Sequence, residues 1–551
     1  MKSFKAAAAA LCMAAAPAAA QSASAPSAPS APLPRPKLVV VVSIDQFSSD
    51  LFAQYRQHFT GGLKRLSDGV VFPSGYQGHA ATETCPGHST ILTGSRPSRT
   101  GIIANAWFNL GLEREDKEVY CSEDPRVPGS SSDKYTVSTY HLKVPAMGDL
   151  MKRATPASRV AVVAGKDRSA IMMGGYKPDQ RWWRAGTDFT SHEGAAPTPA
   201  VTAANRAMAE ALARPSAALP LPAICTARSR AVPTAQSGPI VGDGRFAREA
   251  GDGRAFTASP EYDRAVLGLA GGLRKEMRLG EGAATDLLVV GLSATDYVGH
   301  SYGTQGSEMC IQLLELDRSL GAFFDALDKT GIDYLVALTS DHGGLDIPER
   351  HGAHAVPAAA RVAAELAPSA MDKDLRAKLG LDTQLIHGGG AFGDFYVARS
   401  LTPRQRAQVL AEAVAAYRAH PQVEAVFTHD ALAAAPSPSG PPDEWSLIER
   451  ARASFDPERS GDFIVLLRPS VMPIAKPGRG YTATHGSAWD YDRRVPILFW
   501  RKGLRGFEQP SAVETADIMP TLAAQIGLAI APGSIDGRCL DLDEGPETSC
   551  R

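Results

Sequence analysis

Short apolar, β-branched runs recur along the chain, and each one borders polar residues of reactive types. A nearly continuous apolar run predicts a strand that is buried on both of its faces. Segments with helical periodicity lie between the runs, for example residues 311–327 and 404–419. This alternation predicts an α/β fold with a largely parallel central sheet flanked by helices. The runs are residues 37–44, 159–164, 286–292, 334–339 and 495–500.

Carboxylates and imidazoles follow several of these predicted strands. Asp45 comes directly after the first run, Asp296 comes soon after the third, and Asp341 with His342 follows the fourth. In an open parallel sheet the ligand crevice lies beyond the carboxyl ends of the strands. We therefore expect these side chains to meet in one crevice.

Two long stretches interrupt the alternation of strands and helices. Residues 174–284 are rich in Gly, Pro, Ala and Trp, and residues 345–480 include a spacer-like Pro/Ser/Gly segment. We expect both to be insertions in a catalytic domain that spans residues 37–551. They would form caps over the crevice or loops without a catalytic role.

The charge balance of the chain argues against nucleic acid and membranes as partners. The chain has 551 residues, 57 of them Lys or Arg and 59 Asp or Glu, for a formal net charge of −2. Nothing in this balance indicates bulk attraction to nucleic acid or to a membrane, so a preference for anionic ligands must come from a local site. After the N-terminal segment, no apolar run is long enough to span a bilayer. We expect neither a nucleic-acid partner nor a stable membrane anchor.

The N-terminus predicts export. Residues 1–20 carry Lys2 and Lys5 before an alanine-rich apolar run, and small residues precede Gln21, as in a cleaved signal peptide. A lipoprotein anchor at Cys12 is a weaker alternative, and residues 21–36 read as a Ser/Ala/Pro-rich linker. A periplasmic or secreted location permits up to three disulfides, with the pairing left open. The six remaining cysteines are Cys85, Cys121, Cys225, Cys310, Cys539 and Cys550.

Metal-ligand side chains stand at the predicted strand ends. Asp296 and His300 are four positions apart and share one face if the segment is helical. Together with the other strand-end residues they make an oxygen and nitrogen donor set without thiolate, which suits Zn²⁺. Each short motif alone is weak, since strand-end Asp-His pairs often cap turns; their joint placement carries the prediction. The set is Asp45, Asp296, His300, Asp341, His342 and His485.

Six ligands exceed the needs of one tetrahedral zinc ion and suit two ions with three protein ligands each. Two ions about 4 Å apart can stabilise both the attacking and the leaving oxygen of a displacement at phosphorus. The ligand set therefore predicts phosphoryl transfer.

A basic pair follows the second predicted strand. Lys166 and Arg168 are two positions apart and share a face if the chain is extended there. An ammonium and a guanidinium can together neutralise a phosphoryl dianion. The amide of Asn105 could donate a further hydrogen bond to a phosphoryl oxygen. Taken singly, the pair reads as an exposed loop and Asn105 as a turn residue.

The segment ATETCPGHST, residues 81–90, contains several potential nucleophiles. A cysteine before proline suggests a thiol, and the neighbouring residues suggest an alcohol. The residues alone leave the choice open. The candidates are Thr82, Thr84, Cys85, Ser89 and Thr90.

In combination, these motifs resemble the alkaline phosphatase superfamily. Their order and spacing are similar to its nucleotide pyrophosphatase/phosphodiesterase branch, and residues 165–168 (GKDR) resemble the PafA-type alkaline phosphatases, which use a threonine nucleophile. The matching motifs run from Asp45 to about Trp500 and include Thr84-Cys-Pro-Gly-His88, Asp296…Gly299-His300, Ser340-Asp341-His342-Gly343 and Thr484-His485-Gly486.

The resemblance implies an alkaline phosphatase-like fold and a role for each site residue. One zinc ion would be held by Asp296, His300 and His485. The other would be held by Asp45, Asp341 and His342, with Thr84 as a further ligand. Thr84 would be the nucleophile that forms a phosphothreonine intermediate, and the phosphoryl oxygens would be bound by Asn105, Lys166 and Arg168.

Local sequence around Thr84 agrees with that role. Pro86 suits the first turn of a helix, whose N-terminus would face an anionic substrate. Cys85 is then expected to be packed or disulfide-bonded, and His88 to support the site without binding metal. We rank other histidines below the six named ligands, namely His351, His354 and His387.

The leading hypothesis is an exported phosphomonoesterase with two zinc ions, broad range over small phosphorylated substrates and some diesterase activity. The Lys166 and Arg168 pair favours monoesters because these present a dianion. The alternative is a phosphodiesterase or nucleotide pyrophosphatase with the same metal core. A sulfatase or phosphonate hydrolase ranks third. A sulfatase needs Cys or Ser at the start of a C/S-x-P-x-R motif, and Cys85 is followed directly by proline, with no arginine at the required spacing. A non-catalytic metal-binding protein ranks last, because a full ligand set and a nucleophile are present.

Overall fold

The computed structural model describes residues 33–192, 195–235, 237–545 and 547–550. The expected signal peptide and most of the expected linker lie outside these residues. The contacts divide the chain into residues 1–34 and residues 35–551, and the following description concerns the second unit.

The apolar runs form the strands that their pattern predicts. β1 (Leu38–Ile44), β5 (Val160–Ala164), β10 (Asp286–Leu292) and β11 (Tyr334–Thr339) are buried along their whole length. β18 (Arg494–Arg501) is the fifth run. The two helical patterns also form helices, α11 (Ser307–Asp328) and α14 (Pro403–Ala419).

These strands belong to one ten-stranded sheet. β11, β1, β10, β5 and β6 (Gln180–Ala185) are neighbours in that order and run parallel. β18 pairs antiparallel with β11, and β2 (Val70–Tyr76) pairs antiparallel with β18. The expected largely parallel sheet flanked by helices is confirmed.

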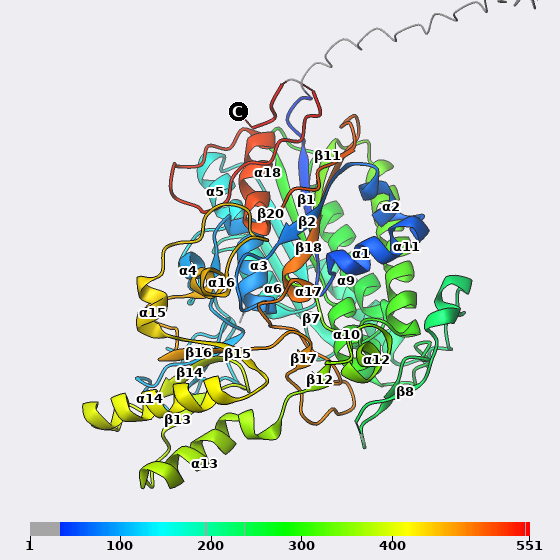
Figure 1. Ribbon diagram of the computed structural model, residues 1–551. Coiled ribbons are helices and arrows are strands. Elements are labelled where there is room, and N and C mark those ends of the chain that lie inside the picture. Colours follow the sequence, from blue (N-terminus) through cyan, green and yellow to red (C-terminus); the bar gives the residue numbers. More distant parts are fainter. Residues whose placement is uncertain (1–32, 193–194, 236, 546, 551) are drawn as a thin grey trace, which may run out of the picture. The chain divides into compact units, whose positions relative to one another are not determined.

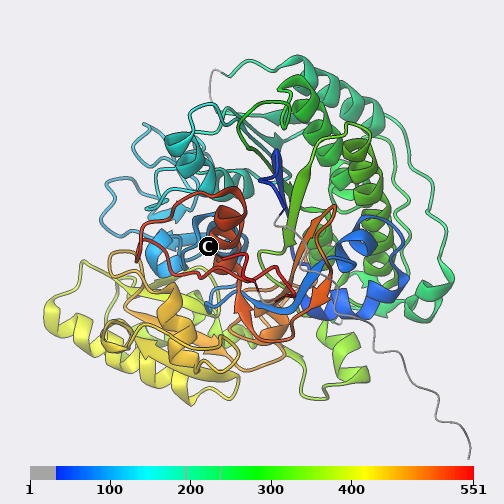
Figure 2. The ribbon, with the colours of Figure 1, turned by 90° about the horizontal axis from the view of Figure 1, so that it is seen from above.

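Each face of the sheet is covered by its own layer of helices (Figure 1). Successive side chains of a strand point to opposite faces. Val40 and Val42 of β1 therefore pack in one core with α9 (Pro260–Glu276) and α11. Val39 and Val41 pack in the other core, which includes residues of α3 (Thr84–Thr93) and α18 (Ile518–Ile526). The view along the sheet in Figure 2 shows the two helical layers separately.

The first stretch that we expected as an insertion takes part in the central sheet. β6 pairs with β5, and β7 (Asp188–Thr190) pairs with β6. α7 (Pro199–Leu212) and α9 pack against each other on one face of that sheet. This stretch therefore adds strands and helices to the main layers.

The second stretch builds a smaller sheet of its own. β13 (Ile386–Gly388), β14 (Gly393–Val397), β16 (Phe463–Leu467) and β15 (Val423–Thr428) are neighbours in that order. Aromatic residues form part of a separate core beneath α13 (Pro368–Leu379) and α14, for example Phe395 and Phe463, which stack at 5.1 Å between ring centroids. These elements lie at the lower left in Figure 1. Whether either stretch is an inserted cap stays a prediction.

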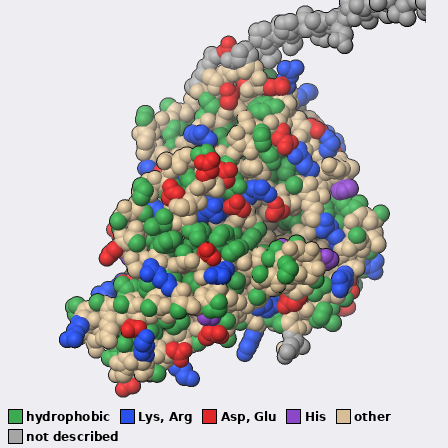
Figure 3. Space-filling view, viewed as in Figure 1, with side chains coloured by type: hydrophobic (Ala, Val, Ile, Leu, Met, Phe, Trp, Pro, Cys, Tyr) green, Lys and Arg blue, Asp and Glu red, His purple; other side chains and the backbone are tan. Residues whose placement is uncertain are grey.

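Three disulfides join the six cysteines. They are Cys85–Cys121, Cys225–Cys310 and Cys539–Cys550. The last pair links two positions of the C-terminal segment that are 11 residues apart. Among the described residues, no helix is both long enough and apolar enough to cross a bilayer. On the face shown in Figure 3, basic and acidic side chains are interspersed.

Candidate active site

The expected site residues gather where neighbouring strands end. Asp45 follows β1, and Asp341 with His342 follows β11. β10 leads into α10 (Ala294–Tyr302), which carries Asp296 and His300. Since β11, β1 and β10 are adjacent and parallel, their carboxyl ends meet at one edge of the sheet.

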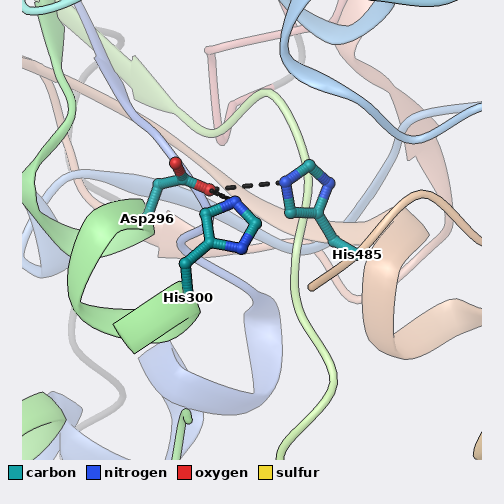
Figure 4. Close-up of side chains that lie close together, drawn as sticks. All are labelled: Asp296, His300 and His485. Carbon is teal, nitrogen blue, oxygen red and sulfur yellow. Dashed lines mark ion pairs between the residues drawn. The ribbon is translucent and has the colours of Figure 1, made fainter. Parts of the chain in front are cut away.

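The first group of ligand atoms contains Asp296, His300 and His485 (Figure 4). Asp296 Oδ1 lies 3.2 Å from His300 Nε2 and 3.4 Å from His485 Nε2. The Nδ1 atoms of the two histidines lie 2.8 Å from the carbonyl oxygens of Ala483 and Thr82 respectively. An Nδ1–H that donates to a carbonyl leaves Nε2 free to bind a metal ion.

The second group surrounds Asp45. His342 Nε2 lies 3.3 Å from Asp45 Oδ1 and 3.2 Å from Asp341 Oδ2, and its Nδ1 is hydrogen-bonded to the Gly343 carbonyl at 2.9 Å. The ligand atoms of Asp45, His342 and Asp296 all lie within 4.8 Å of one another. Asp296 thus belongs to both groups and lies between them. Asp341, expected as a ligand here, also faces His88 Nδ1 at 3.0 Å.

The chemistry of these atoms fits divalent metal. Asp45 Oδ1, Asp296 Oδ1 and Asp341 Oδ2 are buried and accept no hydrogen bond from any described residue. Burial and then the carboxylates of Asp296 and Asp341 raise the pKa of Asp45 above its ordinary value. Buried carboxylates without a compensating cation are unfavourable. Carboxylate oxygens and imidazole nitrogens, without thiolate, are donors that zinc accepts.

Thr84 is the first residue of α3, and its hydroxyl faces Lys166, the ammonium of which contacts two of these carboxylates. The side chain is 1% exposed. Thr84 Oγ1 is 3.5 Å from Lys166 Nζ, which itself lies 2.5 Å from Asp296 Oδ2 and 2.6 Å from Asp45 Oδ2. The loop-to-helix position expected from Pro86 is the one that Thr84 occupies.

The other candidate nucleophiles are engaged elsewhere. Thr82 Oγ1 donates to the Ser487 carbonyl at 2.7 Å. Ser89 and Thr90 donate to backbone carbonyls of their own helix, at 2.7 and 2.9 Å. Cys85 is bonded to Cys121 and has no free thiol. Of the five candidates, Thr84 is the one that faces the strand-end carboxylates through Lys166.

Lys166 is buried and charged. Burial alone would lower the pKa of its ammonium, but the carboxylates of Asp296 and Asp45 raise that pKa above its ordinary value. The ammonium also lies 5.1 Å from the centroid of the Tyr297 ring. A fixed positive charge therefore stands beside the Thr84 hydroxyl.

Arg168 comes two residues later, in the first turn of α6 (Asp167–Gly174). Its Nη1 donates to the Tyr120 hydroxyl at 3.3 Å, while its buried Nε donates to no described residue. The guanidinium is thus held at one end and keeps donors available for a ligand.

Asn105 is held from two sides beside Thr84. Its Oδ1 accepts from the Cys85 backbone N–H at 2.8 Å, and its own backbone N–H donates to Glu83 Oε2 at 2.6 Å. Because Oδ1 is occupied, the amide group of Asn105 remains as a donor toward the site. Burial raises the pKa of Glu83.

Two of the residues around this site had no signal in the sequence. Glu83 anchors Asn105, and Tyr120 contacts Arg168 from a segment far along the chain. His88, expected as a supporting residue, has Nδ1 2.9 Å from the Thr84 carbonyl and 3.0 Å from Asp341 Oδ2. Within the described ranges, the surplus histidines are absent from both ligand groups: His351 and His354 of α12 (Pro348–His354) and His387 of β13.

Known proteins match the chain over most of its length. A family model described as type I phosphodiesterase / nucleotide pyrophosphatase matches residues 39–488. The chain is 58% identical over 519 residues to the alkaline phosphatase PhoK of a Sphingomonas species, a match that covers 94% of this chain and 92% of that protein. It is 48% identical over 519 residues to the alkaline phosphatase PhoD of Zymomonas mobilis, covering 93% and 89% respectively.

The fold matches a solved structure of the same group. The crystal structure of wild-type alkaline phosphatase PafA superposes with a TM-score of 0.80 at 25% sequence identity, covering 92% of this chain and 98% of that one. The expected resemblance to the PafA-type alkaline phosphatases is therefore confirmed. The chain belongs to the type I phosphodiesterase / nucleotide pyrophosphatase family.

Proposed function

We propose that this protein is an exported alkaline phosphatase that hydrolyses phosphate monoesters with two zinc ions and a phosphothreonine intermediate. The enzyme class, a phosphoric monoester hydrolase, rests on the alkaline phosphatases to which the chain is 58% and 48% identical. The observation that carries the mechanism is the position of the Thr84 hydroxyl beside the Lys166 ammonium, which also contacts Asp45 and Asp296.

The donor set supports the proposal of two metal ions. Asp296, His300 and His485 would hold one ion, and Asp45, Asp341 and His342 would hold the other, with Thr84 as a further ligand. Bound zinc would lower the pKa of a coordinated hydroxyl and stabilise charge on the leaving oxygen. Asp45 and Asp296 both contact the Lys166 ammonium, and this proximity supports the proposal that ions held by the two groups would act on one phosphorus.

The reaction by this proposal begins when the Thr84 hydroxyl gives its proton to solvent water and its oxygen attacks phosphorus. The bond from phosphorus to Thr84 Oγ1 forms as the bond to the leaving oxygen breaks, and that oxygen takes a proton from water to leave as the alcohol. Lys166 and Arg168 neutralise charge on the non-bridging oxygens, and the Asn105 amide donates to one of them. Water then cleaves the phosphothreonine, which releases inorganic phosphate and restores the Thr84 hydroxyl.

The test compares a phosphate monoester with its matched diester. We expect purified enzyme to have a higher kcat/KM for p-nitrophenyl phosphate than for bis(p-nitrophenyl) phosphate, to lose turnover with a chelator and to regain it with zinc. Mass spectrometry after an acid quench should detect phosphate on the peptide that carries Thr84. Absence of monoester turnover at every pH from about 7 to 10, the range in which zinc-bound water ionises, would rule the proposal out.

Phosphodiester hydrolysis is the second candidate function. It is favoured by the family model, whose description names phosphodiesterases and nucleotide pyrophosphatases. A diester presents one negative charge and a second substituent, so the Lys166 and Arg168 pair would give it less stabilisation. A kcat/KM that is higher for the diester would favour this candidate.

Export is proposed from the N-terminal sequence, and the disulfides support it. Three disulfides, such as Cys225–Cys310, are typical of a protein that folds in an oxidising compartment. Fractionation of cells that express the full chain should place the activity outside the cytoplasm, with an N-terminus near Gln21.

A further inference from the structure

Tyr120 contacts the GKDR segment from a distant part of the chain. It ends β4 (Glu118–Tyr120), which pairs antiparallel with β3 (Ala106–Phe108). Its hydroxyl donates to Asp167 Oδ1 at 2.8 Å and accepts from Arg168 Nη1 at 3.3 Å. Burial raises the pKa of Tyr120 to about 12, so the hydroxyl keeps its proton and can do both.

Tyr135 lies beside Tyr120 and contacts Asp167 but forms no hydrogen bond with Arg168 among the described residues. The two ring centroids are 4.5 Å apart. The Tyr135 hydroxyl donates to the other oxygen of the same carboxylate, Asp167 Oδ2, at 2.9 Å. The two tyrosines therefore share Asp167 but differ in their contact with the guanidinium.

The strand end that carries Tyr120 is also tied to the nucleophile. Cys121 follows Tyr120 and is disulfide-bonded to Cys85, the neighbour of Thr84. The Cys121 backbone N–H donates to the Asn105 carbonyl at 2.9 Å. These two links hold the Tyr120 hydroxyl at a set position relative to Thr84 and Asn105, which would contact the substrate in the proposed reaction.

We propose that Tyr120 is a positioning residue, whose hydroxyl holds the Arg168 guanidinium where it meets a phosphoryl dianion and so sets the preference for monoesters over diesters. This inference rests on the proposed function. A free arginine side chain has many rotamers, and ordering it at each binding event opposes binding. The Tyr120 hydroxyl orders it in advance, at a distance from Thr84 that Cys85–Cys121 maintains.

The experiment compares Tyr120→Phe with Tyr135→Phe in the zinc-loaded enzyme. Each variant removes one hydroxyl from the same pair of neighbouring rings and one hydrogen bond from Asp167. Three quantities are measured: kcat/KM for p-nitrophenyl phosphate, kcat/KM for bis(p-nitrophenyl) phosphate, and the affinity for inorganic phosphate by titration calorimetry. The melting temperature of each variant reports on folding.

We expect Tyr120→Phe to lower the monoester kcat/KM and the phosphate affinity by about 10- to 100-fold, as for loss of a hydrogen bond to a charged group. Its diester kcat/KM should fall by less than about 3-fold, and Tyr135→Phe should stay within about 3-fold of wild type for every quantity. In an Arg168→Ala background, Tyr120→Phe should cause no further loss, because its effect acts through Arg168.

Equal losses for both esters, or equal behaviour of the two tyrosine variants, would overturn the positioning role. Unchanged phosphate affinity in Tyr120→Phe would also overturn it, and this measurement needs no turnover. Failure of the proposed function would show separately, as wild-type enzyme that does not hydrolyse the monoester.

Discussion

The hydroxyl oxygen of Thr84 lies 3.5 Å from the ammonium nitrogen of Lys166, although 82 positions separate the two residues in the chain. The same nitrogen contacts Asp45, which follows β1, and Asp296, which lies in the helix after the adjacent strand β10. One cation therefore links the proposed nucleophile to both proposed metal groups. The predictions below start from this arrangement.

Thr84→Ala should lower kcat/KM for p-nitrophenyl phosphate by at least about 10³-fold, because no neighbouring hydroxyl can take its place. Zinc content and melting temperature should stay close to those of wild type. Thr82→Ala is the control, since the Thr82 hydroxyl is hydrogen-bonded to the Ser487 carbonyl. Undiminished turnover in Thr84→Ala would place the nucleophile elsewhere.

Replacing Lys166 and Arg168 together by alanine should reduce monoester hydrolysis far more than diester hydrolysis. The monoester carries a second negative charge that the two cations neutralise, and the diester lacks it. The ratio of the two kcat/KM values measures the effect. Equal losses for both substrates would contradict a role in binding the dianion.

The Cys85–Cys121 disulfide should affect activity as well as stability. Loop closure predicts that loss of either this pair or Cys225–Cys310 costs about 4 kcal/mol of unfolding free energy. Only the first pair adjoins Thr84 and Asn105. We expect the double alanine variant of Cys85 and Cys121 to lose stability and turnover. The matched variant of Cys225 and Cys310 should lose stability alone; similar turnover in the two would contradict the prediction.

Removal of metal should lower the melting temperature as well as abolish turnover. Asp45, Asp296 and Asp341 carry buried oxygens without donors, which a bound cation would stabilise. Scanning calorimetry with EDTA, followed by added zinc, measures the shift and its recovery. Asp45→Asn should show a smaller shift, because it removes one of the buried charges. A melting temperature that is insensitive to EDTA would argue against structural binding of metal here.

His141 should make the protein acid-sensitive. It is 5% exposed, and burial followed by the charge of Arg459 lowers its pKa to about 3. The unfolded chain therefore binds a proton at His141 more readily than the folded protein does. The free energy of unfolding is at its full value above about pH 6.5 and decreases as pH falls toward 3. Between pH 6.5 and 5, wild type should lose about 1.5 kcal/mol more than His141→Phe, measured by urea unfolding. Parallel losses would show that His141 does not titrate as described.

The positions of the central strands were largely predictable, because a buried strand needs a local run of apolar residues. A strand buried on both faces requires a continuous apolar run, so β1, β10 and β11 could be located from composition alone. Asp45, Asp341 and His342 could be nominated for the same reason, since they stand where such runs stop. The strand that extends the sheet at β6 was missed, because its Arg and Trp residues do not form such a run.

Contacts between segments that are distant in sequence could not be located from such a local pattern. The hydrogen bond from Asn105 to Glu83, the pairing of Cys85 with Cys121 and the contact of Tyr120 with Arg168 each depend on how separate segments pack. Residue type permits many partners for a carboxylate, a thiol or a phenol, and only the folded chain selects one.

The sequence by itself determined five strands of the central sheet, the donor types near their ends and the family, because a buried strand needs a local apolar run and the motifs are stretches of residue types. Only the tertiary structure decided that Asp296 lies between the two ligand groups, that Lys166 faces Thr84 and that Tyr120 contacts Arg168. Distances between side chains follow from the order of strands in the sheet and from the packing of loops above it. Those are properties of the whole fold and of no single segment.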